Sequence, residues 1–338
     1  MKALARHREA ILARHREAIL AAIVVAMTAA IGTYAPVFVT PDSLAGTMND
    51  TAFLFMMALA QMAVILTRGI DLSVAANLAL TGMLTAMVAR AHPGLPALAF
   101  AVLGLAIGLG FGLVNGALIA GLGIPPIVVT LGTLAIFRGM IVVVGGGGQV
   151  NASDMGEGFQ SLPRSTFLGL SSVFWIAVAV AVLAWLFLGL TRPGRGLYAV
   201  GCNPVAARYC GIDLGRQQLI AYSISGAVAG LCGYLWVARY GVAYVEIATG
   251  YELTVIAACV IGGVSIGGGI GTVPGTLLGA LFIGVIVNAL PVMQVSPFWQ
   301  MLVSGAVILL AVSLNARAEA RPDKLILSRA RQDAARAR

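Results

Sequence analysis

Long apolar stretches dominate this sequence and decide what it can fold into. They cover residues 19–39, 48–67, 72–90, 96–120, 124–144, 168–190, 218–238, 251–266, 272–290 and 297–315. A helix that crosses a bilayer needs about 17 to 25 mainly apolar residues, and nearly all of these stretches reach that length. Only 10% of the residues are charged, against about a quarter in soluble domains. We therefore predict an all-α integral membrane protein with about ten transmembrane helices, some of them broken.

Lysine and arginine residues set the expected orientation, because they are retained on the cytoplasmic side during insertion. They gather in an N-terminal tail (1–18), a central polar loop (191–217) and a C-terminal tail (316–338). We predict that all three segments are cytoplasmic and that 19–315 is one membrane domain. The basic residues left in or near the outer half are Arg90, Arg138, Arg164 and Arg239.

The net charge of +8 therefore indicates topology and attraction to anionic membrane lipid rather than nucleic-acid binding, since no aromatic residues are interleaved in the basic tails. The sequence shows no catalytic set, metal cluster or cofactor motif. The glycine-rich segment 262–271 lacks the Lys-Ser/Thr ending of a phosphate-binding loop and is interpreted as a helix break with close packing. An N-terminal duplication, in which residues 6–12 recur as 14–20, is given no function.

A short polar run at 203–211 lies between long apolar stretches. Asn203 can cap a helix, Pro204 suits its first position, and Gly211 suits the position just past its end. The run is therefore predicted to be a helix of about two turns. It is either an ordinary solvated turn or a helix that a partner protein binds.

Residues 68–74 interrupt two apolar stretches. Gly69 can end one helix, and Asp71 or Ser73 can accept the free N–H groups of the next. An ionisable residue at membrane depth costs about 2.5 kcal/mol or more, so Asp71 is also a functional candidate. A half-helix end that lines a pathway would satisfy both interpretations. Residues 48–90 form either two crossings or one broken helix.

Glycines recur every four residues in two places, which puts them on one helix face and allows close packing with a neighbouring helix. They are Gly104, Gly108, Gly112 and Gly116 in one stretch, and Gly267, Gly271, Gly275 and Gly279 leading into another. Asn115 and Asn288 near the two ends hint at paired halves. Polar residues inside the stretches, such as Asn77 and Asn115, are more often interhelical hydrogen-bonding groups than ligand contacts.

Several segments together resemble the membrane subunit of bacterial ATP-binding cassette importers for ribose and related monosaccharides. They are 69–74 (GIDLSV), 114–119 (VNGALI), 191–201 (TRPGRGLYAVG), 203–208 (NPVAAR), 250–253 (GYEL) and 261–269 (IGGVSIGGG). The resemblance runs from about residue 50 to 315. Ala75 and Cys202 depart from the family, which usually has glycine at both positions.

The resemblance implies a non-enzymatic permease of the bacterial inner membrane that forms a homo- or heterodimer. A periplasmic sugar-binding protein would deliver the substrate, and a separate cytoplasmic ATPase would hydrolyse ATP. It makes 203–211 the coupling helix, with Ala206 and Ala207 permitting close approach and Arg208 pairing with the ATPase. It places a pathway at the dimer centre, around the helix break at Gly69, Asp71, Ser73, Asn77 and Asn115.

Two other functions stay open at this point. The chain is alternatively a secondary transporter driven by protons or sodium, with Asp71 as its ion-coupling residue, or a structural or sensory membrane module. Within the importer interpretation, residues 65–77 resemble permeases assigned to rhamnose more than those for ribose, and autoinducer-2 importers are also similar.

Overall fold

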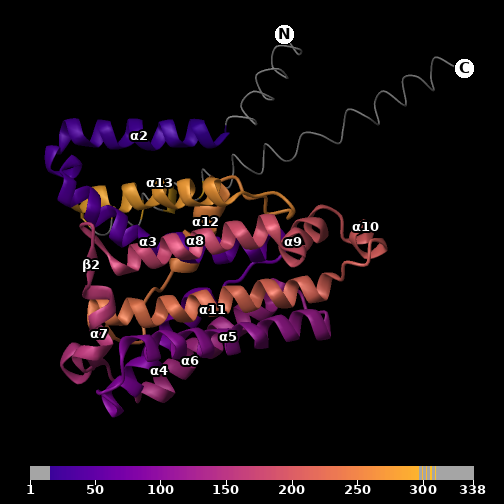
Figure 1. The fold of residues 1–338 in the computed structure, drawn as a ribbon, viewed down its shortest axis with the longest axis horizontal. Helices are drawn as coiled ribbons and strands as arrows, with labels where there is room; N and C mark the ends of the chain where they lie inside the picture. The colour runs from indigo at the N-terminus through magenta and orange to yellow at the C-terminus, as the bar shows by residue number, and fades with distance from the viewer. Residues whose placement is uncertain (1–15, 297–298, 300–301, 303–304, 307–308, 310–338) are drawn as a thin grey trace, which may run out of the picture.

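The computed structural model describes residues 16–296 together with residues 299, 302, 305, 306 and 309. Within these residues the chain is a bundle of helices that lie roughly side by side (Figure 1). Eight of the described helices are long and apolar enough to cross a membrane. They are α2 (Arg16–Tyr34), α3 (Pro41–Leu66), α4 (Val74–Ala91), α5 (Ala97–Leu122), α6 (Pro126–Gly145), α8 (Ser172–Leu190), α11 (Leu214–Tyr240) and α13 (Val273–Val292).

Eight of the ten predicted stretches thus correspond to helices of spanning length. The predicted stretch 251–266 is shorter than expected, because α12 (Tyr251–Ile261) has only 11 residues. The helix ends at Gly262, and Gly263 follows with a φ of 98°, a conformation that favours glycine. The stretch 297–315 lies largely outside the described residues, as do the tail residues 1–15 and 316–338.

Residues 48–90 form two separate helices, which answers the question left open by the sequence. Thr40 caps α3 by accepting from the N–H of Ser43, and Pro41 occupies the first helical position. After Leu66 the chain turns back through an extended segment, 67–73, before α4 begins at Val74 (Figure 1). Helix α11 packs against both α3 and α4.

Small elements lie at the two ends of the bundle. One end holds α9 (Arg192–Cys202) and α10 (Pro204–Tyr209). The opposite end holds α7 (Glu157–Arg164) and the short strands (Figure 1). Strand β1 (Val150–Asn151) pairs antiparallel with β4 (Val242–Ala243), and β2 (Thr166–Phe167) with β3 (Leu170–Ser171). Single-turn 3₁₀ helices occur at η1 (Pro36–Val39) and η2 (Ala152–Asp154).

Close backbone contact joins α5 to α11. A Cβ atom added to Gly108 would overlap the carbonyl oxygen of Gly226, and one added to Gly112 would overlap that of Tyr222. The relation is reciprocal, because a Cβ atom on Gly230 would overlap the carbonyl oxygen of Gly104. Lipid offers no hydrophobic drive between helices, so this approach lets dispersion contacts hold the pair together.

A second close contact joins α12 to α13. A Cβ atom on Gly275 would overlap the carbonyl oxygen of Gly262, and one on Gly279 would overlap that of Ala258. Gly267 and Gly271, however, lie in the loop before α13 begins at Val273. The prediction that they continue one helical glycine face was therefore wrong.

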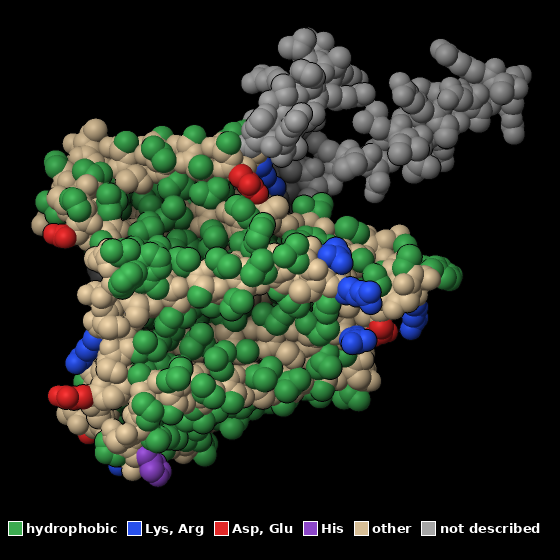
Figure 2. Space-filling model, in the orientation of Figure 1, with side chains coloured by type: hydrophobic (Ala, Val, Ile, Leu, Met, Phe, Trp, Pro, Cys, Tyr) green, Lys and Arg blue, Asp and Glu red, His purple; other side chains and the backbone are tan. Residues whose placement is uncertain are grey.

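The core is centred on α3, whose residues 51–66 are all buried. The flanks formed by α5, α6 and α8 expose many large apolar side chains instead. Figure 2 shows apolar side chains covering this flank, with charged side chains gathered toward the two ends of the bundle. This arrangement suits a protein whose sides face lipid and whose ends face water.

Candidate functional site

A helical hairpin formed by α9 and α10 projects from one end of the bundle (Figure 1). Thr191 caps α9 by accepting from the N–H of Gly194 at 3.0 Å. Asn203 caps α10, because its Oδ1 accepts from the N–H groups of Val205 and Ala206 at 3.1 and 3.0 Å. Gly211 follows with a φ of 77°. Helix α10 was predicted from the sequence and α9 was not, although the cap at Thr191 and the proline at Pro193 are signals for it.

The outer face of α10 carries large exposed side chains. Tyr209 is 89% exposed and Val205 65%, and Arg208 and Ala206 are exposed as well. Ala207 is only 5% exposed. Ala207 is thus already covered by this chain, whereas Ala206 is accessible and its contact with a partner stays a prediction.

A hollow of about 560 Å³ lies beside α10. It is lined by the end of α5, the Arg208 and Tyr209 side of α10, and the start of α11. Exposed tyrosine and arginine are the residue types that contribute most to protein interfaces. This face is therefore the candidate docking surface, defined as Val205, Ala206, Arg208, Tyr209 and the adjacent hollow.

A junction connects this docking surface to the membrane helices. We define it as residues 66–69, 201–202 and 268–271. The N–H of Gly269 donates to the carbonyl oxygen of Leu66 at 3.1 Å, and the Cys202 Sγ lies 3.4 Å from the carbonyl oxygen of Gly269. A Cβ atom on Gly201 would overlap the Leu66 carbonyl oxygen, so only glycine fits there.

Two side chains hold the junction together. Arg68 donates from Nε to the carbonyl oxygen of Gly201 and from a second nitrogen to that of Cys202. The Tyr198 hydroxyl donates to the carbonyl oxygen of Gly271 at 3.0 Å. Burial raises the pKa of Tyr198, which keeps its hydroxyl protonated as a donor. Neither residue was predicted to have this role, although Arg68 directly precedes the predicted break at Gly69.

A buried polar network surrounds Asp71. Its Oδ1 accepts from the backbone N–H of Ser73 at 3.0 Å and from the Ser73 hydroxyl at 2.6 Å. Its Oδ2 accepts from the Ser225 hydroxyl of α11 at 2.8 Å. Asn115 of α5 donates from Nδ2 to the Ser73 hydroxyl oxygen at 2.8 Å. The structure thus brings three predicted residues together and adds Ser225, which no sequence motif marked.

Asn77 and Gly69 extend this network. The Asn77 Nδ2 lies 3.4 Å from the carbonyl oxygens of both Gly108 and Gly226, where α5 and α11 approach most closely. A Cβ atom on Gly69 would lie 2.6 Å from the Tyr222 hydroxyl oxygen. The absence of a side chain at Gly69 therefore lets the Tyr222 hydroxyl approach the backbone of this segment. The two residues therefore tie segment 67–73 and α4 to the α5–α11 pair.

The network is enclosed within this chain. Asp71, Ser73, Asn77 and Asn115 are each at most 3% exposed. Buried carboxylates need hydrogen-bond donors to offset the loss of water, and three donors are supplied here. The Asn115 Oδ1 is a buried acceptor without a partner among the described residues. In the single chain, this arrangement anchors the interrupted segment, and its predicted role as a pathway lining stays a prediction.

The opposite end of the bundle is held by different contacts. Arg138 of α6 donates to the carbonyl oxygens of Val245 and Ile247, both at 2.8 Å, and so fixes the loop between α11 and α12. Arg239 pairs with Asp50 at 2.7 Å. Both arginines were predicted to lie in or near the outer half, but their partners could not be predicted from the sequence.

Among the described residues, arginine is more frequent at the α9–α10 end than at the opposite end, which carries Arg90, Arg138, Arg164 and Arg239. The α9–α10 end carries Arg16, Arg68, Arg192, Arg195, Arg208 and Arg216. The positive-inside rule predicts that this end faces the cytoplasm.

Comparison with known proteins gives a consistent result. Residues 43–312 match the family model described as "Branched-chain amino acid transport system / permease component". The ribose import permease of Escherichia coli strain K12 is 37% identical over 293 residues, covering 86% of this chain and 91% of that protein.

Two further relatives carry other substrates in their names. The autoinducer 2 import system permease of Salmonella typhi is 34% identical, covering 85% of this chain and 81% of its own length. The D-allose transport system permease of Escherichia coli strain K12 is 34% identical, covering 87% and 89%. No solved structure gives a significant match.

Proposed function

Because this chain belongs to the family of permease components described for branched-chain amino acid transport systems, we propose that it is the membrane permease subunit of an ATP-driven importer for a monosaccharide. The observation that carries the proposal is the match to the ribose import permease, which extends over 91% of that protein. A second similar relative is named for allose, which is also a monosaccharide. Because the chain is also similar to an autoinducer 2 permease, autoinducer 2 stays an alternative substrate.

In this proposal α10 is the helix that docks on a separate cytoplasmic ATPase. The exposed Val205, Arg208 and Tyr209 support it, as does their position at the arginine-rich end. The junction supports it further, because Gly201 and Cys202 end α9, one residue before α10, and contact the segment after α3 and the loop before α13. Movement of α10 would thus reach two interrupted parts of the membrane domain through packed backbone.

The remaining partners follow from the same proposal. A periplasmic sugar-binding protein would dock at the opposite end, on the surface formed by α7, the β2–β3 hairpin and the β1–β4 strand pair. A second permease subunit would complete the pathway, with the interrupted segment 67–73 near the dimer centre. The subunit would lie in the bacterial inner membrane with the tails 1–18 and 316–338 in the cytoplasm.

The test is sugar uptake into proteoliposomes that contain the chain with its ATPase and binding protein. We expect uptake of labelled ribose or rhamnose only when all three proteins and ATP are present. The same liposomes with labelled autoinducer 2 decide between substrate classes. Uptake by the chain alone, driven by a proton or sodium gradient, would contradict the proposal.

Asp71 separates the importer from the ion-coupled alternative. In the structure its carboxylate accepts three hydrogen bonds within the chain, which supports a role as an anchor. We expect Asp71→Asn to lower the amount of folded protein while the remaining protein still requires ATP. An ion-coupled transporter would instead keep its fold and lose its gradient dependence.

A further inference from the structure

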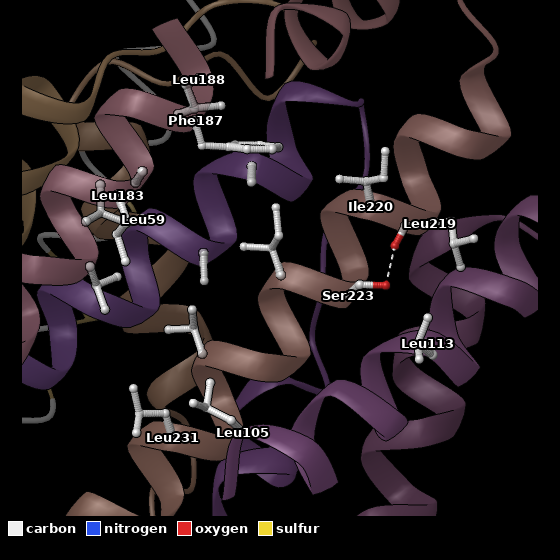
Figure 3. Close-up of a pocket in the computed structure, with 16 residues that line it drawn as sticks. Leu59, Leu105, Leu113, Leu183, Phe187, Leu188, Leu219, Ile220, Ser223 and Leu231 are labelled. Atoms are coloured by element: carbon white, nitrogen blue, oxygen red, sulfur yellow. Dashed lines mark hydrogen bonds between the residues drawn. The ribbon is translucent and has the colours of Figure 1, made fainter. Parts of the chain in front are cut away.

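An apolar groove runs along the flank of the bundle between α3, α5, α8 and α11 (Figure 3). It has a volume of about 640 Å³. Its lining is apolar, with Leu59, Leu105, Phe187 and Leu231 among the side chains that point into it. The hydroxyl of Ser223 donates to the carbonyl oxygen of Leu219 at 2.7 Å, so this polar group is already satisfied within α11.

The length of the groove matches one leaflet of a bilayer. On α11 the lining runs from Leu219 to Leu231. At a rise of 1.5 Å per residue, this distance is about 18 Å. The hydrocarbon core of a bilayer is about 30 Å thick, so one leaflet contributes about 15 Å. The groove therefore has the length of one lipid acyl chain, and it begins toward the α9 end.

Positive charge is in excess at that end of the groove, where Asp213 is the nearby acidic residue in the sequence. Arg192 and Arg195 follow the last groove residues of α8, and Arg216 lies one turn before Leu219 on the same face of α11. All three are exposed. The one ion pair in the described part of the chain joins Arg239 to Asp50 at the other end. Figure 2 shows several basic side chains and one acidic side chain at this end of the molecule.

We propose that the groove binds one anionic phospholipid from the leaflet at the α9 end. An acyl chain lies along α11, and the headgroup phosphate is held by Arg192, Arg195 and Arg216. Charge complementarity selects an anionic lipid over a zwitterionic one. The proposal goes beyond the transport function and does not depend on it, because lipid retention is measured on the permease alone.

The headgroup test is native mass spectrometry of the full chain in detergent, after incubation with phosphatidylglycerol or phosphatidylcholine of the same acyl chains. We expect at least tenfold higher retention of phosphatidylglycerol. Each arginine near an anionic surface contributes about fivefold, so R192Q/R195Q/R216Q should remove this preference. The matched control is Arg164→Gln at the opposite end, which should leave it unchanged. Equal retention of both lipids, or a triple variant that behaves like the control, would overturn the proposal.

The acyl-chain test fills the groove. Ala184 lines it, whereas Val182 on the same helix is exposed outside it. We expect Ala184→Phe to abolish phosphatidylglycerol retention and Val182→Phe to preserve it, with equal thermal stability for the two variants. If both retain lipid equally, the groove is not the site. If Ala184→Phe instead converts a dimer into monomers and leaves lipid retention intact, a second copy of the chain occupies the groove. The proposal then fails.

Discussion

The guanidinium group of Arg68, just after α3, lies against the last turn of α9, with its Nε 2.8 Å from the carbonyl oxygen of Gly201. Arg68 has a φ of 64°, a left-handed conformation that is uncommon for residues other than glycine. The backbone therefore accepts strain to place this side chain. The contact joins the segment that leads into Asp71 to the residues that directly precede α10.

Removal of this contact should uncouple ATP hydrolysis by the partner ATPase from sugar transport through the permease. Arg68→Met keeps the apolar stem and removes both hydrogen bonds, whose net contribution to stability is small because Arg68 is exposed to solvent. We expect sugar transported per ATP hydrolysed to fall about tenfold or more in proteoliposomes, with little loss of inserted protein. Arg90→Met at the other end is the control. An unchanged ratio in Arg68→Met would show that the junction does not carry the coupling.

Two glycines on one helix offer a direct test of the packing of α5 against α11. A methyl group at Gly108 would overlap the Gly226 carbonyl oxygen, whereas a methyl group at Gly110 meets nothing within 4 Å. We expect Gly108→Ala to destabilise the protein by about 1 to 3 kcal/mol through overpacking. Gly110→Ala should be neutral or stabilising by up to about 1 kcal/mol, because alanine favours helix. Thermal unfolding in detergent measures both, and equal melting temperatures would contradict the close contact.

Arg208 and Tyr209 should dominate binding to the ATPase. We expect Arg208→Glu and Tyr209→Ala each to weaken binding in pull-down at least tenfold, since exposed interface residues of these types often contribute 2 kcal/mol or more. Membrane insertion should be unchanged because both side chains are exposed. Arg164→Glu, at the opposite end, is the control for altered charge. Pull-down at the level of the unaltered protein would place the docking surface elsewhere.

Cysteine labelling tests the orientation. Cys202 and Cys210 are exposed at the α9–α10 end, whereas Cys232 and Cys259 are buried. A thiol reagent that cannot cross membranes should therefore leave intact cells unlabelled and label inside-out vesicles at the two exposed positions. The variant Cys202→Ser/Cys210→Ser provides the background. Labelling of intact cells above this background would invert the proposed topology.

The sequence predicted the helices well because apolar length is a strong local signal. The capped helix at 204–209 could also be predicted, since Asn203 and Pro204 carry all the needed information in adjacent positions. The limits of α12 could not, because the apolar pattern continues past Ile261 although the glycines that follow end the helix. The prediction for Gly267 and Gly271 was wrong for a similar reason. Their four-residue spacing is that of a helix, but both lie in the loop before α13.

The site was predictable only where its residues lie close in sequence. Asp71 and Ser73 stand out as polar residues in an apolar setting. Ser225 does not, because a lone serine in a helix gives no sign that it meets a carboxylate 154 positions earlier. The junction was missed for a similar reason, since its three segments become neighbours only through the packing of α3, α9 and the loop before α13.

The hydrogen bond from Gly269 to Leu66 joins the two places where this chain interrupts its membrane helices. One interruption lies in the first half of the sequence and the other in the second half, and each leaves backbone groups that must be satisfied by protein at that depth. Helices α3 and α13 also pack directly on each other, and the hydroxyl of Thr276 in α13 donates to the sulfur of Met62 in α3 at 2.9 Å. A change in the tilt of α3 relative to α13 would therefore have to rearrange both hydrogen bonds. The least regular part of the bundle is thus also where segments from the two halves of the sequence are held together by backbone.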